Sequence, residues 1–167
     1  MIEDEVEISI EEIEERAKEF LKLSGNCAQS SFATIQEQFG LNSEDILKAL
    51  TPFPGLALRG EACGAVIGSL MALGLVYGRE ELSNQRGYLA SLPSARRFCS
   101  EFEKVYGSTS CANILESKMG KKFNLADSKE SKEYLLAGGQ EICGDVVVCA
   151  VKIAADLIKK KKIKKDF

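Results

Sequence analysis

The longest stretch without a charged residue runs from residue 62 to residue 78 and sets the first limit on the fold. Its 17 residues include four glycines, a serine and a tyrosine. About 20 apolar residues are needed for a helix to cross a bilayer, so this stretch is too short to be read as a membrane span. We therefore predict a helix from about Gly60 to Val76 that is buried in the core of a globular domain.

Most other apolar residues recur at the spacing of amphipathic helices, and no alternating strand pattern of useful length is present. The spacing predicts further helices over residues 8–24, 26–39, 44–50, 82–92, 94–106, 111–119, 128–137 and from residue 140, after Gly138-Gly139, onward. With 167 residues, of which 45% are hydrophobic, the chain has the size of one domain. We expect residues 1–167 to form a single all-α domain, a bundle of about six to seven helices.

Several helix boundaries are marked by residues with a physical preference for them. Asn26, Ser43 and Ser110 are placed to accept hydrogen bonds from the first turn of a helix. Pro93 lacks the backbone N–H that a helix interior needs, so it is expected to separate the helices over 82–92 and 94–106.

The absence of histidine excludes many kinds of site. It removes Ser-His-Asp and Cys-His catalysis, histidine-bound zinc and histidine-bound haem. Six cysteines remain as the residues with distinctive chemistry. The sequence therefore directs attention to thiol chemistry.

The charge of the chain and its terminal segments indicate its partners and its cellular location. The net charge of −3 argues against nucleic acid as a partner, because phosphate binding needs a basic face. The acidic first 20 residues do not resemble a secretory signal, so we expect a cytoplasmic protein that does not span a membrane. Residues 159–167 read as a basic, solvated and frayed helix end, with contact to a membrane surface or nucleic acid as the alternative. We also expect self-association as a homodimer and an unidentified redox partner protein.

Three cysteines lie at predicted helix starts: Cys27, Cys111 and Cys143. Free N–H groups and the positive end of the helix dipole stabilise a thiolate there and can lower the pKa of the thiol. The thiolate is the form that attacks disulfides and binds soft metals. These positions therefore predict reactive or metal-binding thiols.

Cys63 lies within the predicted central helix, with Gly60, Gly64 and Gly68 at four-residue spacing on one face. Each glycine costs a helix about 1 kcal/mol relative to alanine, so the three need a reason. One reading is close contact between helices. The other is room for a bulky group, such as a metal cluster, beside the Cys63 sulfur, and the two are compatible.

Cys99 and Cys149 follow apolar residues and read as small hydrophobic residues of the core. No pair of cysteines is separated by two residues, so zinc ribbons, thioredoxin-type exchange and ferredoxin-type cluster runs lack local support. Any site must be assembled by the fold from distant positions.

Four segments together resemble a family of redox-active proteins named for its cysteine pattern, C_GCAxxG_C_C. They are residues 25–29 (GNCAQ), 60–68 (GEACGAVIG), 98–111 (FCSEFEKVYGSTSC) and 143–147 (CGDVV). The resemblance covers about residues 25–155. The central segment reads Cys-Gly-Ala where the family name implies Gly-Cys-Ala.

The resemblance implies an α-helical domain, found mostly in anaerobic prokaryotes, with cysteines that are redox-active or bind an iron–sulfur cluster. A similar domain occurs in a cytochrome that carries haem, a part that this chain cannot repeat without histidine. Carried over by position, the site consists of Cys27, Cys63, Cys111 and Cys143.

Three functions follow as hypotheses. In the first, these four cysteines bind an iron–sulfur cluster for electron transfer or redox sensing, with Gly60, Gly64 and Gly68 making room for it. In the second, the same cysteines form a metal-free thiol–disulfide system in which Cys27 or Cys63 attacks. In the third, four thiolates hold a structural zinc ion in a scaffold or interaction module.

Overall fold

The fold is described for residues 9–165 of a computed structural model, with side chains as far as residue 161. Nine α-helices and no strand lie within those residues, which confirms the all-α single domain but not the expected six to seven helices. The helices are α1 (Ile10–Ser24), α2 (Cys27–Phe39), α3 (Glu44–Ala49), α4 (Gly55–Leu58), α5 (Gly64–Tyr77), α6 (Gln85–Tyr106), α7 (Cys111–Met119), α8 (Ser128–Leu136) and α9 (Gly139–Lys165). Residue 8, where the first helix was expected to begin, lies outside the described residues.

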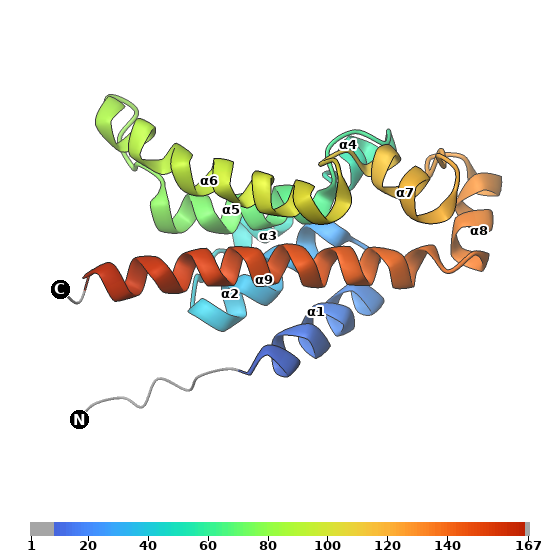
Figure 1. The fold of residues 1–167 in the computed structure, drawn as a ribbon, viewed down its shortest axis with the longest axis horizontal. Coiled ribbons are helices and arrows are strands. Elements are labelled where there is room, and N and C mark those ends of the chain that lie inside the picture. The colour runs from blue at the N-terminus through green and yellow to red at the C-terminus, as the bar shows by residue number, and fades with distance from the viewer. Residues whose placement is uncertain (1–8, 166–167) are drawn as a thin grey trace.

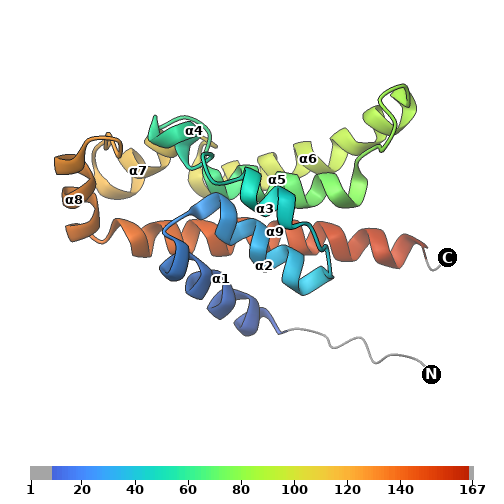
Figure 2. The same ribbon diagram turned by 180° about the vertical axis from the view of Figure 1, so that it is seen from behind.

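Helix α9 runs the length of the molecule, and the other helices are arranged around it (Figure 1). It packs against α1, α2, α5 and α6 along its length and against α7 and α8 near its start. Seen from behind, α2 and α3 lie in front of α5 and α9 (Figure 2). The fully buried aromatic side chains of the core are Phe32, Phe98 and Phe102.

The closest helix pair is α2 with α5, and glycines make its approach possible. A Cβ atom on Gly68 would lie 2.2 Å from the Ala28 carbonyl oxygen and 2.2 Å from the Ser31 hydroxyl oxygen. Such distances are far shorter than van der Waals contact, so no larger residue fits without movement of α2. Gly64 and Gly68 therefore serve close contact between helices, one of the two roles considered for them.

Local capping signals place several helix starts as expected. The Asn26 side chain accepts a hydrogen bond from the Gln29 amide (2.9 Å), and Ser110 occupies the same position before α7. Ser43 lies at the cap of α3 but makes no capping bond with its side chain. The last helix begins at Gly139, one residue earlier than predicted, and its backbone remains helical through Lys165.

The predicted division at Pro93 is wrong, because α6 continues through it. Pro93 is exposed, and so is Leu89 one turn earlier. The carbonyl group that loses its N–H partner at such a site can bond to water, which reduces the cost of a proline inside a helix.

The short turn α4 is left-handed. Its residues all have positive φ angles: Gly55 (54°), Leu56 (50°), Ala57 (61°) and Leu58 (62°). This conformation costs about 1–2 kcal/mol for each residue other than glycine. Hydrogen bonds from the Ala57 amide to the Pro52 carbonyl and from the Leu58 amide to the Pro54 carbonyl, both 2.8 Å, hold it in place.

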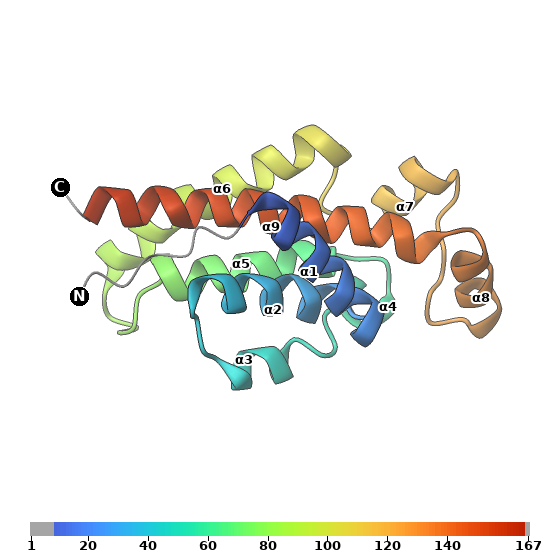
Figure 3. The same ribbon diagram turned by 90° about the horizontal axis from the view of Figure 1, so that it is seen from below.

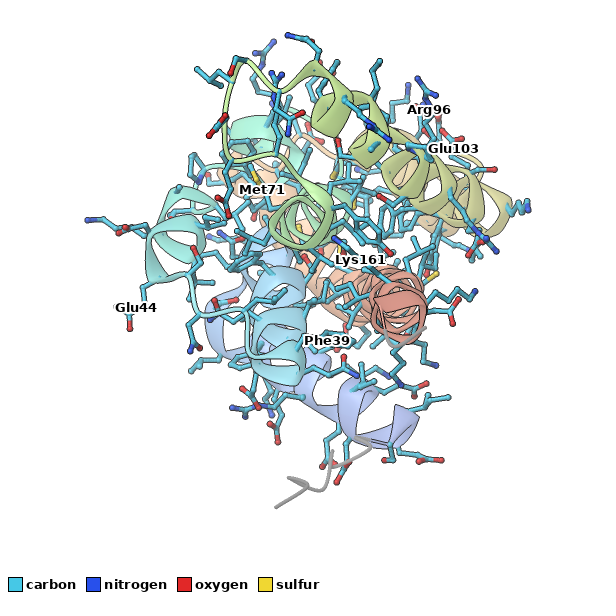
Figure 4. All side chains as sticks on the ribbon, turned by 90° about the vertical axis from the view of Figure 1, so that its left-hand side faces the viewer. Phe39, Glu44, Met71, Arg96, Glu103 and Lys161 are labelled. Carbon is cyan, nitrogen blue, oxygen red and sulfur yellow. The ribbon has the colours of Figure 1, made fainter. Side chains whose placement is uncertain are left out.

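Near the end of α9, Lys161 reaches the end of α5. Its ammonium group donates to the Val76 carbonyl and lies 4.6 Å from the centre of the Tyr77 ring. Viewed end-on, Lys161 lies between the two helices, whereas Met71 lies on the outer side of α5 (Figure 4). In the described part of the chain, no helix has the length and apolarity required to cross a membrane.

Candidate functional site

Four helices start at the same end of the molecule. Helices α1 and α6 lead into this end, and α2, α5, α7 and α9 begin there, beside α4 and α8 (Figures 1 and 3). Cys27 and Cys111 are the first residues of α2 and α7, and Cys63 is the residue that precedes α5. Cys143 is in the first two turns of α9. The fold therefore brings all four family-pattern cysteines to one end of the bundle.

Cys27 is fixed by its neighbour Asn26. Besides capping α2, the Asn26 side chain donates a hydrogen bond to the Thr51 carbonyl (2.9 Å). This bond ties the start of α2 to the segment that leads into α4. The Cys27 sulfur then lies against α5, because a Cβ atom on Gly64 would be only 2.4 Å from it.

Cys63 and Cys111 are brought together by a short backbone pairing. The Cys63 amide donates to the Thr109 carbonyl (2.8 Å), and the Cys111 amide donates to the Glu61 carbonyl (2.7 Å). Ala62 and Ser110 form an antiparallel bridge between these bonds. The segment before Gly64 is therefore extended, and the central helix starts four residues later than predicted.

This pairing corrects the prediction that three glycines share one helix face. Gly60 lies outside α5 with a φ angle of 76°, a conformation that favours glycine. A Cβ atom there would be 3.0 Å from the Cβ atom of Ala112. Gly60 thus permits the close approach of the α7 start.

Cys143 has a side-chain partner. The Tyr134 hydroxyl group on α8 donates a hydrogen bond to the Cys143 sulfur over 3.0 Å. Tyr134 is nine residues before Cys143 in sequence, and the turn at Gly138 folds α8 back onto α9.

A cavity of about 330 Å³ opens among these helix starts. Cys27, Cys111 and Cys143 line it, while Cys63 is 6% exposed and is not among the lining residues. The exposed side chains of Leu58 (40%) and Leu135 (54%) form part of its rim. The other lining residues are Leu21, Gly25, Pro54, Gly55, Gly60, Phe123, Leu125, Ser131, Tyr134 and Gln140.

Burial keeps these thiols protonated. It raises the pKa of Cys63 to about 12 and that of Cys111 to about 11. It also raises the pKa of Cys27 well above its usual value, with further increases from the charges of the other three cysteines. The pKa of Cys143 is raised by burial, and the hydrogen bond from Tyr134 acts in the opposite direction.

The expectation of lowered thiol pKa values at helix starts is therefore wrong for the metal-free protein. The N–H groups of Val66 and Ala65 do lower the pKa of Cys63, but burial outweighs them. The mutual influence of the four thiols also shows that they lie within electrostatic range of one another.

Cys99 and Cys149 do not line the cavity. Both were predicted to belong to the core, and both are partly buried residues that pack against it. Cys149 faces a surface hollow that Glu14, Lys18 and Lys152 also line. Their separation from the cavity agrees with leaving them out of the site.

Several residues that shape the cavity could not be recognised from the sequence. Tyr134, Phe123 and Leu58 come from segments that contain no cysteine, and they meet the site only through the fold. In the described part of the chain, no three Cys, Asp or Glu side chains are gathered closely enough to hold one metal ion as they stand.

Comparison with known proteins bears on the cysteine pattern. The sequence matches the family described as "Putative redox-active protein (C_GCAxxG_C_C)" over residues 25–157, which contain all six cysteines. This match confirms the resemblance seen in the four segments. No curated protein and no solved structure gave a match.

Proposed function

The chain belongs to the C_GCAxxG_C_C family of redox-active proteins, and from this premise we propose that Cys27, Cys63, Cys111 and Cys143 hold an iron–sulfur cluster. The bound cluster would supply reversible electron storage for electron transfer or redox sensing. The observation that carries the proposal is that Cys27, Cys111 and Cys143 line one cavity, with Cys63 buried close enough to influence the Cys27 thiol electrostatically.

The electrostatics of the cavity support bound cations. Four thiolates without compensation would be costly there, because burial and mutual repulsion both raise the pKa of Cys27 and Cys63. Iron would replace the four protons and supply positive charge. The N–H groups at the starts of α2, α5 and α7 add to this compensation.

The shape of the site favours a cluster over a single zinc ion. Four cysteine sulfurs bind zinc at about 2.3 Å from one point. Here three of the thiols line a cavity of about 330 Å³, and no three Cys, Asp or Glu side chains among the described residues are close enough to hold one metal ion as they stand. A cluster with several irons takes its ligands from a wider circle, so it matches this arrangement better.

The metal-free thiol–disulfide hypothesis has less support. An attacking thiol works best when its pKa is near the ambient pH. The pKa of Cys63 is raised to about 12, and that of Cys27 is also well above its usual value. Neither thiol is therefore prepared to attack at neutral pH without a further change in the site.

The chain itself would shield and orient the redox centre. Pro54, Leu58, Phe123 and Leu125 give the cavity an apolar lining, and no Asp, Glu, Lys or Arg is among its lining residues. An apolar lining lowers the effective dielectric constant around a bound cluster, which influences its reduction potential. Gly60 contributes to the wall, so its predicted role in making room for a cofactor remains part of the proposal.

A matched pair of variants tests the proposal. Cys63→Ser is expected to lose most of the iron and acid-labile sulfide of protein purified without oxygen, because it removes one of the four ligands. Cys149→Ser makes the same change outside the cavity and is expected to keep both. Equal iron and sulfide in Cys63→Ser and wild-type protein would contradict the assignment of Cys63.

The compartment, the redox partner and the oligomeric state of the protein are also part of the proposal. Six free thiols suit a reducing compartment, so we place the protein in the cytoplasm with a redox partner protein. The expected homodimer is a prediction that analytical ultracentrifugation would test.

A further inference from the structure

One cysteine of the site differs from the other three. Within residues 9–161, Cys143 is the only cysteine whose sulfur receives a hydrogen bond from a side chain, and the donor is the Tyr134 hydroxyl group at 3.0 Å. Tyr134 and Cys143 both line the cavity. The bond therefore forms at the wall of the proposed redox centre.

The packing of its ring fixes the position of the Tyr134 hydroxyl group. The Phe123 ring meets it edge-on, with the two ring centres 5.9 Å apart. On the other side is Gly139, where a Cβ atom would lie 2.1 Å from Tyr134 Cε2. Phe123 is buried, and Gly139 leaves no room for a larger residue. The ring is thus held between the loop before α8 and the first residue of α9.

We propose that Tyr134 is a positioning residue, which holds the Cys143 sulfur at the cavity and raises the reduction potential of the redox centre formed there. The inference rests on the proposed function in one respect, since it needs a redox centre that includes Cys143. It applies to an iron–sulfur cluster, because reduction of a cluster adds electron density to its sulfur ligands.

The direction of the effect follows from the hydrogen bond. A donor to sulfur stabilises the more negative, reduced form more than the oxidised form. Without the donor, reduction becomes harder and the potential shifts to a more negative value. The ring alone cannot have this effect, because it offers no polar hydrogen to the sulfur.

The variant Tyr134→Phe separates the hydroxyl group from the ring. It keeps the contacts with Phe123 and Gly139, so the fold and the iron content are expected to match those of wild-type protein. The control is Tyr88→Phe, which removes the same hydroxyl group from an exposed position on α6.

The first readout is the reduction potential of protein purified without oxygen. We expect Tyr134→Phe to change the equilibrium constant between oxidised and reduced forms about tenfold, which corresponds to about 59 mV for a one-electron couple. The shift is toward a more negative potential, and Tyr88→Phe is expected to show none. An unchanged potential in Tyr134→Phe would overturn the inference.

The second readout uses metal-free, reduced protein and NMR. We expect nuclear Overhauser contacts between the Tyr134 ring and the Cys143 β-protons, with one dominant Cys143 χ1 rotamer. In Tyr134→Phe the contacts remain but the rotamer preference is lost. The same rotamer preference in both proteins would refute positioning. If wild-type protein forms no cluster, the proposed function fails, while this measurement still decides whether Tyr134 positions Cys143.

Discussion

Replacement of Gly64 by alanine tests the contact between α2 and α5 that brings Cys27 beside Cys63. The added Cβ atom would lie 2.4 Å from the Cys27 sulfur, 3.0 Å from the Ala28 amide nitrogen and 3.1 Å from Pro54 Cα. Two of these neighbours are backbone atoms, which cannot rotate away. Helix α2 or the segment before α4 would therefore have to move.

The size of the effect follows from two opposing contributions. Gly64 is the first residue of α5, so alanine in its place stabilises the helix by less than the value of about 1 kcal/mol expected in a helix interior. Insertion of a methyl group into a packed site costs about 1–3 kcal/mol, and a contact of 2.4 Å is at the severe end of this range. We expect Gly64→Ala to lower the free energy of unfolding by about 1–2 kcal/mol, or the Tm by about 2–8 °C for a chain of this length.

The same helix offers a control of opposite sign. Gly74 is on the exposed side of α5, and no atom lies within 4 Å of its Cβ position. Gly74→Ala should therefore raise the free energy of unfolding by about 1 kcal/mol. Urea unfolding of reduced, metal-free protein measures both variants. If Gly64→Ala proves as stable as Gly74→Ala, the close packing of α2 on α5 described above is incorrect.

Two further predictions concern strain and pH. Ala57→Gly should stabilise the protein by about 0.5–1 kcal/mol, because Ala57 has a φ angle of 61°, which favours glycine. The control Ala90→Gly, on the exposed face of α6, should destabilise the protein by about 1 kcal/mol. Equal effects of the two variants in thermal unfolding would rule out the left-handed turn. Above about pH 9 the Cys63 thiol of the unfolded chain loses its proton, whereas the buried Cys63 thiol of the folded protein keeps its proton until about pH 12. The free energy of unfolding of reduced, metal-free protein should therefore fall by up to about 1.4 kcal/mol per pH unit because of this thiol. Cys63→Ala should have a shallower decline in urea unfolding at several pH values, and an identical decline would show that Cys63 is not held protonated.

Features that depend on neighbouring residues were predictable from the sequence. Asn26 and Ser110 each accept a hydrogen bond from an amide three residues later, so the helix starts at Cys27 and Cys111 follow from local chemistry. The absence of an alternating strand pattern likewise predicted the fold class. The grouping of cysteines relied on the resemblance to a family, because no two of the four are close in sequence.

Features that depend on distant residues were not predictable in this way. Residues 60–63 have the apolar and glycine content that placed them in the predicted central helix. Their backbone instead pairs with residues 109–112, so Cys63 lies before the helix and not within it. The pKa direction of the thiols was also mistaken, because helix starts act locally whereas burial depends on the whole fold. Tyr134 belongs to an ordinary amphipathic helix, and only the turn before α9 brings it to Cys143.

The most direct test of the account is the iron and acid-labile sulfide content of wild-type protein purified without oxygen. The account predicts iron and sulfide bound together, with visible absorbance that bleaches on reduction, in a protein whose Cys27, Cys63, Cys111 and Cys143 resist alkylation until the iron is removed. Protein that contains neither iron nor sulfide, and whose count of free thiols falls on oxidation, would contradict the cluster and assign the redox chemistry of this cavity to a disulfide.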